Sequence, residues 1–365
     1  MALDTLKDKT NVVPKTMVIC RFYGPRDIRY EKVDIPEIKD EELLVKVKVA
    51  ISGGSSLKTY LRGHPVLVNK ELPSPFGHQF SGEVVKAGDK VKRFQAGNKI
   101  VAVNSSPCFK CTYCLSKKFS LCENIYFLNG AFADYICIPK EIVENNTYKL
   151  SDNLSFEVAA ELESLAVVLH GLERSHITEG QTVCILGTGS IGLLFTALSK
   201  ELGAEVIVIG RSDFKLNLAQ EMGADHVLKI SGNEEKLIRD VKNITNNIGP
   251  EVVIEAVGKK ETWELATKLV KKGGLVNFFG GCKKGEKVEL DTYRLHYDEL
   301  RLIGVFHHTP EYVRKALELL EKNISLQEKI TSKLITHRYP LSRLIEAFAM
   351  QQKGNCIQAA IYPEN

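Results

Sequence analysis

The sequence predicts a mixed α/β fold in which a doubly wound parallel sheet is inserted into a β-rich domain. Up to about Pro139, short apolar or alternating segments lie between glycine, proline and aspartate, as is typical of strands. From about Asn153, strand-like and helical segments alternate, which implies βαβ crossovers and a parallel sheet. The closing segment IQAAIYP can return as a strand to the first domain.

The individual elements follow from the apolar periodicity. Strands are expected at VVPKTMVICRF, EELLVKVKVAI, FSGEVVKAG and NKIVAV. A helix is expected at 154–175 with Ser155 as its N-cap. Next come the strands TVCILG, EVIVIG, HVLKI, EVVIEAV and LVNFFGG, with helices such as 191–203 and 213–223 between them. A last long helix is predicted at 310–322.

Composition and charge narrow the class of protein. The 365 residues are 44% hydrophobic and 26% charged, with a formal net charge of +4, which indicates a globular chain of about two domains. The charges are mixed along the chain, so neither nucleic acid nor a membrane surface is an expected partner. No segment approaches the roughly 18 apolar residues of a membrane span, and the polar start lacks a signal-peptide core. We expect a cytoplasmic protein with a small-molecule substrate.

A glycine motif predicts a dinucleotide site. Gly187, Gly189 and Gly192 form G-x-G-x-x-G, enclosing Ser190 and Ile191, between a predicted strand and helix. The first glycine permits the tight turn, the second lets a pyrophosphate approach the backbone, and the third lets the helix pack closely on the strand. The helix N-terminus offers free N–H groups to the phosphates. A plain glycine turn is the alternative.

The residues after the second strand of this unit indicate the cofactor. An NAD-binding protein usually carries an acidic residue there, which holds the ribose 2′-hydroxyl. This chain has Gly210, Arg211 and Ser212 instead, followed by Lys215. A guanidinium pairs well with a 2′-phosphate, so we predict NADP as the cofactor. NAD remains the alternative, with Arg211 as a solvated surface residue.

Four clustered cysteines predict a metal site. Cys108, Cys111, Cys114 and Cys122 lie in one short window, whereas the other five cysteines are scattered. An odd total with local clustering indicates metal binding in a reducing compartment. Four sulfur ligands without an open position are typical of structural zinc. A redox dithiol and an iron–sulfur cluster are the alternatives.

Together these features resemble the medium-chain dehydrogenase/reductase superfamily, in its zinc-containing alcohol and polyol dehydrogenase branch. The resemblance rests on the four-cysteine lobe, GHQFSGEVVKAG, GAFADY, LESLAVVLHG and the order of the nucleotide-binding elements. It implies a Rossmann domain at 161–305 inserted into a GroES-like catalytic domain, which spans 17–160 and is completed by 306–365, behind an N-terminal arm at 1–16. It also implies hydride transfer between a nicotinamide and an alcohol or carbonyl carbon, and a homodimer or homotetramer.

The sequence departs from this family where the catalytic zinc is usually bound. The family uses a cysteine in a C-G-[TS]-D-like segment, the histidine of G-H-E, and a later cysteine or glutamate. In this chain the cysteine position falls on Gly53, or on Ser52 if the segment slips by one. The aspartate position is Ser56, and the glutamate after the histidine is Gln79. Loss of the thiolate and of supporting residues indicates that this metal is absent.

Two positions that match family ligands remain, His78 and Glu163. We therefore expect a catalytic site without metal, and a variant second metal site at His78 and Glu163 is the alternative. Ser55, His78 and Glu163 are the predicted catalytic residues, because Ser55 matches a family proton relay and His78 can exchange protons near neutral pH. Glu163 is expected to orient His78.

Two further segments are carried over from the resemblance. Gly258 matches a strand end that forms part of the cofactor wall. His307 and His308 fall in a region that approaches the nicotinamide in the family, and a surface turn before the helix at Pro310 is the alternative.

The sequence thus predicts an NADP-linked oxidoreductase that transfers hydride to or from a small alcohol or carbonyl, or an activated double bond, without catalytic zinc. A zinc-dependent alcohol or polyol dehydrogenase with an unusual metal site is the first alternative. A nucleotide-binding protein that has lost catalysis is the second.

Overall fold

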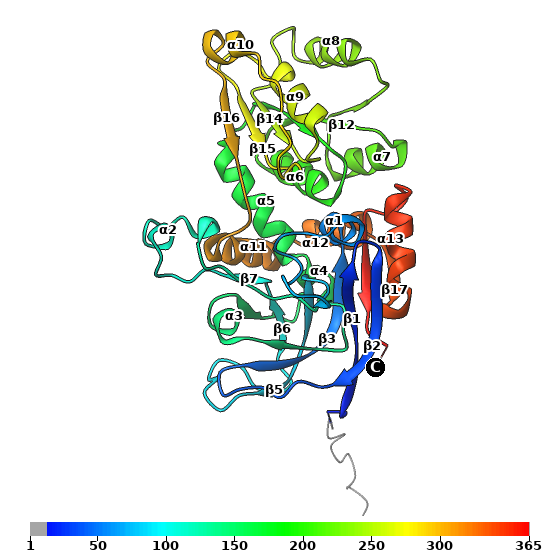
Figure 1. Cartoon of the computed structure of the whole chain (residues 1–365). Coiled ribbons are helices and arrows are strands. Elements are labelled where there is room, and N and C mark those ends of the chain that lie inside the picture. Colours follow the sequence, from blue (N-terminus) through cyan, green and yellow to red (C-terminus); the bar gives the residue numbers. More distant parts are fainter. Residues whose placement is uncertain (1–12, 365) are drawn as a thin grey trace, which may run out of the picture.

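A computed structural model of the chain describes residues 13–364, so most of the predicted N-terminal arm lies outside the described residues. The described part divides into a β-rich portion and a parallel sheet surrounded by helices, with α5 (Leu162–Ser175) and α11 (Pro310–Lys322) between them (Figure 1). Among the described residues, no helix is both long enough and apolar enough to cross a lipid bilayer.

The β-rich portion is built around a sheet in the order β10-β6-β5-β3-β18-β17, with β9 also paired to β3. Its strands are β3 (Leu43–Ser52), β5 (Phe80–Ala87), β6 (Lys99–Ala102), β9 (Tyr135–Ile138), β10 (Thr147–Lys149), β17 (Ile335–Pro340) and β18 (Gln358–Tyr362). Smaller sheets join β1 (Thr16–Gly24) to β2 (Asp27–Asp34) and β4 (Ser74–Pro75), and β7 (Ser105–Ser106) to β8 (Tyr126–Phe127). The C-terminal strand β18 pairs antiparallel with β3, which confirms the expected return of the chain.

The second portion is a parallel sheet in the order β13-β12-β11-β14-β15-β16. Its strands are β11 (Thr182–Leu186), β12 (Glu205–Gly210), β13 (His226–Lys229), β14 (Val252–Glu255), β15 (Leu275–Phe278) and β16 (Arg301–Gly304). They alternate with α6 (Ser190–Glu201), α7 (Asp213–Met222), α8 (Glu234–Ile244), α9 (Lys260–Leu269) and α10 (Thr292–Tyr297). The strand order reverses between β11 and β14, where such sheets bind nucleotides. The predicted fold class is confirmed.

The remaining helices include two differences from the sequence expectation. They are α1 (Gly54–Arg62), α2 (Thr112–Leu115), α3 (Lys140–Asn145), α4 (Phe156–Ala160), α12 (Ile324–Lys329) and α13 (Leu344–Gln352). Ser155 caps α4 by accepting a hydrogen bond from the Val158 N–H, but the expected continuous helix breaks at Glu161. Helix α1 was not expected, because two glycines precede its short amphipathic stretch.

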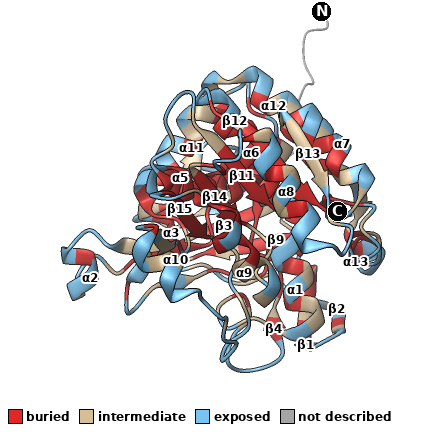
Figure 2. Ribbon diagram, turned by 90° about the horizontal axis from the view of Figure 1, so that it is seen from above, coloured by how far each residue is buried: buried red, intermediate tan, exposed pale blue. Residues whose placement is uncertain are grey.

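One apolar core joins the two portions. Ile51 of β3, Leu165 of α5 and Ile185 of β11 are fully buried in the same cluster. Figure 2 shows β11, β14 and β15 coloured as buried, among helices that carry both buried and exposed residues. Burial of this kind supplies most of the stabilising free energy of a domain, so we expect the two portions to hold a fixed relative position around the site between them.

Candidate active site

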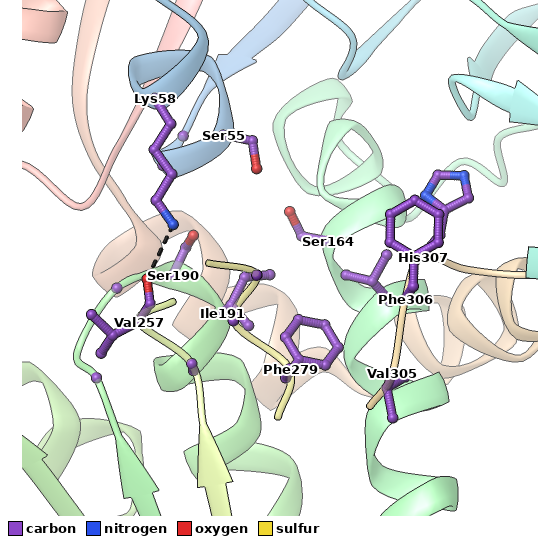
Figure 3. A pocket seen from close by; sticks show the side chains of 18 of the residues that line it. Ser55, Lys58, Ser164, Ser190, Ile191, Val257, Phe279, Val305, Phe306 and His307 are labelled. Atoms are coloured by element: carbon purple, nitrogen blue, oxygen red, sulfur yellow. Dashed lines mark hydrogen bonds between the residues drawn. The ribbon is translucent and has the colours of Figure 1, made fainter. Parts of the chain in front are cut away.

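A cleft of about 1580 Å³ is lined by residues from both portions of the fold. The parallel sheet contributes the glycine turn after β11 and the residues after β12, and the β-rich portion contributes α1, His78 and part of the four-cysteine lobe. Figure 3 shows Ser55 of α1 and Ser164 of α5 on opposing walls, each with its hydroxyl directed into the space between them. Residues predicted separately for cofactor and substrate therefore border one space.

The glycine turn has the shape that a dinucleotide requires. Gly187 has a φ of 117°, and a Cβ there would lie 2.9 Å from Val257 Cγ2. A Cβ on Gly192 would lie 2.0 Å from the Gly187 carbonyl oxygen, so any side chain would separate helix from strand. Gly189 has nothing within 4 Å of its Cβ position, which leaves room for a phosphate at the helix N-terminus. Gly192 itself does not reach the cleft wall, whereas Ser190 and Ile191 do.

Two cations flank the end of β12. Arg211, Ser212 and Lys215 all line the cleft, and Arg211 is exposed. Burial lowers the pKa of the Lys215 ammonium, and the nearby Arg211 charge acts in the same direction. A phosphate placed between two such cations would relieve their repulsion.

A buried carboxylate shapes the neighbouring turn after β14. Glu255 Oε1 accepts hydrogen bonds from the Val257 and Gly258 N–H groups, each at 2.9 Å. Gly258 has a φ of 77°, and a Cβ there would lie 2.4 Å from the Gly281 carbonyl oxygen. Gly258 therefore contributes close backbone packing behind the cleft wall, while Val257 forms the wall itself.

Lys58 of α1 connects the two portions across the cleft. Its Nζ donates a hydrogen bond of 3.1 Å to the Val257 carbonyl, which Figure 3 shows as a dashed line. Burial lowers the pKa of this ammonium, and Arg62 also lowers it. The contact holds the helix that carries Ser55 against the nucleotide side of the cleft.

The predicted catalytic residues all line the cleft. Glu163 accepts a hydrogen bond of 2.7 Å from Gln79 Nε2, so the partner that the structure gives it is Gln79, and the expectation that it orients His78 stays a prediction. Burial raises the pKa of Glu163 to about 7, against the opposing effect of the Gln79 amide. Burial lowers the pKa of His78 to about 4, and His64 adds to that shift. His78 is thus a neutral imidazole at pH 7, while burial favours the protonated form of Glu163.

The place of the family's zinc-binding cysteine is occupied by an amide. Gly53 is buried, and a Cβ there would lie 3.2 Å from Gln358 Nε2. Gln358 reaches this point from β18 and donates a hydrogen bond of 3.2 Å to the buried Glu161. A second amide, from Gln79, donates to Glu163 and to Ser164 at 2.7 Å. Gln358 thus fills the space of the missing thiolate, and with only His78 and Glu163 left, the residues present do not fit a zinc ion at the family position.

The segment after β16 is folded inward, so the surface-turn alternative is wrong. His308 is 3% exposed and His307 is half-buried. Ser105 Oγ lies 2.6 Å from His307 Nε2 and 3.4 Å from His308 Nε2. His170 donates from Nδ1 to the His307 carbonyl at 2.7 Å. Burial lowers the pKa of His307 to about 3, so its imidazole is neutral.

Glu163, His307 and His308 form a compact group of ligand atoms, which we call the histidine cluster. One ligand atom from each of these residues lies within 4.8 Å of those of the other two. Sequence reasoning left the two histidines open, because only the return of the chain after β16 brings them beside Glu163.

The four cysteines form the second group of this kind in the part of the chain that the structure describes. Cys108 Sγ lies 3.9 Å from Cys114 Sγ, and Cys111 Sγ lies 4.0 Å from Cys122 Sγ. Tetrahedral zinc with bonds of about 2.3 Å requires sulfur atoms about 3.8 Å apart, so the arrangement fits that ion. The lobe also reaches the cleft through residues 117–121.

Comparison with known proteins identifies the family. Residues 39–149 match the alcohol dehydrogenase GroES-like domain, and residues 190–322 match the zinc-binding dehydrogenase model. The chain is 30% identical to a sorbitol dehydrogenase of Bacillus subtilis over 97% of this chain and 99% of that protein. It is 32% identical to a D-arabitol-phosphate dehydrogenase of Enterococcus avium over 93% and 94%, respectively.

Comparison with solved structures supports the same family. A zinc-binding dehydrogenase from Sinorhizobium meliloti, bound to NADP, superposes with a TM-score of 0.85 at 29% identity, covering 96% of this chain and all of that one. The chain belongs to the medium-chain dehydrogenase/reductase superfamily, in its zinc-containing alcohol and polyol dehydrogenase branch. It is an oxidoreductase of the alcohol dehydrogenase type.

Several contributors to the site were missed from the sequence. Lys58, Glu255 and Gln358 carry no motif of their own. Lys58 and Gln358 act through contacts with segments far along the chain, whereas Glu255 accepts hydrogen bonds from the turn that directly follows it. The sequence did contain one signal for Gln358. Gly53 stands where the family has a cysteine, and a side chain lost from a core leaves space that another residue must fill.

Proposed function

We propose that this protein transfers hydride between NADP(H) and a small alcohol or carbonyl, or an activated double bond, without zinc at the family's cysteine position. The observation that carries the proposal is the single cleft bordered by the glycine turn on one side and by Ser55, His78 and Glu163 on the other. Hydride transfer itself belongs to the nicotinamide, and the protein positions the substrate and moves its proton.

The polar residues of the cleft have distinct roles in this proposal. Ser55 is exposed to the cleft on the first turn of α1, and we assign it to a hydrogen bond with the substrate oxygen. Burial holds the Glu163 pKa near 7, where a carboxyl group exchanges protons efficiently. The neutral His78 supplies one N–H donor and one acceptor to the same wall.

The cofactor preference rests on Arg211 and Lys215, which face the cleft where the adenosine ribose is expected. In this proposal the pyrophosphate turn consists of Gly187, Gly189, Ser190, Ile191 and Gly192. Ser212 lines the cleft beside Arg211 after β12, and Gly258 supports the cleft wall from behind. The four cysteines hold one structural zinc.

We also infer domain limits at 17–160, 161–305 and 306–365, which the membership of the two large sheets supports.

Nicotinamide absorbance during turnover tests this function. The purified protein is assayed with NADPH and NADH on a panel of polyols, polyol phosphates, amino alcohols, aldehydes and enones. Arg211→Ala is expected to weaken NADPH binding about 10- to 100-fold, as for a lost charge-assisted hydrogen bond, and to leave NADH binding nearly unchanged. Arg239→Ala, on the exposed face of α8, is the matched control.

Two results would contradict the proposal. Tight NADPH binding without turnover on any member of the panel would favour a nucleotide-binding protein that has lost catalysis. Equal weakening of both cofactors in Arg211→Ala would remove the basis for an NADP preference.

A further inference from the structure

The histidine cluster has the composition of a metal site, and it shares only Glu163 with the positions that match family ligands. Two imidazoles and one carboxylate are the ligands that zinc and other borderline divalent metals prefer. Glu163 and His307 line the cleft, and His308 lies directly behind them in the protein. Ligand atoms of all three residues lie within 4.8 Å of one another, a spacing that one ion can bridge with small side-chain adjustments.

A second observation is that one buried nitrogen of the cluster has no hydrogen-bond partner. His308 is 3% exposed, and its Nδ1 has no hydrogen-bond partner among the described residues. A buried polar atom without a partner destabilises the folded state, so such atoms call for an explanation.

Ser105 lies where the two rings converge. Its hydroxyl is 2.6 Å from His307 Nε2 and 3.4 Å from His308 Nε2. His170 fixes the backbone of the same segment through the His307 carbonyl. Metal-binding histidines are commonly held by such outer contacts, so the rings are oriented before any ion arrives.

We infer that Glu163, His307 and His308 bind a divalent transition metal, with Zn²⁺ as the reference ion, in place of the family site that Gly53, Gln79 and Gln358 no longer form. Three protein ligands leave at least one coordination position for water or for an oxygen of the substrate, as in catalytic zinc sites. The inference deepens the proposed function and rests on the same cleft. With an ion bound, proton movement falls to Ser55 and His78.

Metal content per chain tests the inference without using activity. The full chain is loaded with Zn²⁺, dialysed against metal-free buffer and analysed for bound zinc. The wild type is expected to hold two ions per chain, one in the four-cysteine lobe and one in the histidine cluster. His307→Ala and His308→Ala are expected to hold one.

Three further variants make the test specific. His337→Ala removes a histidine of β17 outside the cleft and is expected to keep both ions. His78→Ala is also expected to keep both, because His78 lies outside the cluster. Glu163→Gln preserves side-chain volume and is expected to hold one ion, which covers the case in which a histidine variant fails to fold. Circular dichroism and NADPH binding report folding for each.

One ion in the wild type would overturn the inference. So would a second ion that persists in both His307→Ala and His308→Ala but is lost in His78→Ala, because that pattern places the metal at the family position. A protein that turns over substrate with a single ion would refute the metal site and leave the proposed function intact.

Discussion

The four-cysteine lobe and the histidine cluster are two groups of metal ligands built in opposite ways. The lobe draws its ligands from residues 108–122, and its Cys108 and Cys111 are half-buried at the surface. The cluster draws its ligands from α5 and from the segment after β16, about 140 residues away in the chain, and it borders the cleft. A local turn can hold the first group together, whereas only the complete fold can hold the second.

This difference explains how one region can change while the other keeps the family pattern. Each lobe cysteine is fixed by the other three, so a single substitution destroys the group. The cleft instead combines side chains from several elements, and Gln358 fills the space that Gly53 leaves. Substitutions in such a cleft can therefore replace one set of metal ligands by another while the fold is kept.

The largest effect is expected from a substitution that removes one zinc ligand of the four-cysteine lobe. Cys111→Ser should remove the structural zinc, because metal binding in such lobes supplies much of their folding free energy, about 10–16 kcal/mol in isolated zinc-finger peptides. Zinc content should fall by one ion per chain, and limited proteolysis should cut within residues 108–122. Cys137→Ser, which changes a cysteine outside the lobe, should do neither.

The second largest effect is expected on kcat, from a substitution in the histidine cluster. Glu163→Gln should lower kcat about 100- to 10,000-fold, because the residue that carries the proton or holds the ion is neutralised. NADPH affinity should change little, since Glu163 lies outside the glycine turn. Single-turnover kinetics with a saturating substrate measure the chemical step, and an unchanged rate would clear Glu163 of any chemical role.

Two glycine substitutions extend the comparison to the glycine turn, which is a second group formed by neighbouring residues. Gly189→Ala places a methyl group in open space, so it should weaken NADPH binding about 10-fold or more while the melting temperature stays unchanged. Gly192→Ala pushes a methyl group against the Gly187 carbonyl and should lower the free energy of unfolding by about 1–3 kcal/mol or more. Calorimetric binding and thermal unfolding separate the two. Similar losses of stability in both variants would contradict these distinct roles.

The smallest effect tests a long-range contact. Lys58→Met removes the hydrogen bond to the Val257 carbonyl and should cost about 0.5–1.5 kcal/mol, or roughly 2- to 12-fold in KM for the cofactor. The apolar stem is retained, so the fold should be unaffected. A change in kcat alone, with KM unchanged, would show that Lys58 does not connect α1 to the nucleotide side.

The sequence predicted those parts of the molecule that local physical rules determine. The alternation of strands and helices after Asn153 gave the parallel sheet, and the helix at 310–322 lies at Pro310–Lys322 in the structure. Ser155 was identified as a cap because a hydroxyl before an apolar helix satisfies a free N–H.

The parts that could not be predicted depend on contacts between distant segments. The pairing of Glu163 with Gln79 spans 84 residues, and that of Gln351 with Ser52 spans 299. Side-chain hydrogen bonds of this range follow from the complete fold, which periodicity does not describe. For the same reason the inward turn of His307 and His308 was indistinguishable from a surface loop.

Anomalous diffraction at the zinc absorption edge, from crystals of the chain grown with NADPH and Zn²⁺, tests this account most directly. The account predicts two peaks per chain, one among the four lobe cysteines and one between Glu163, His307 and His308. A single peak in the lobe, or a second peak coordinated by His78 beside Gly53, would contradict it.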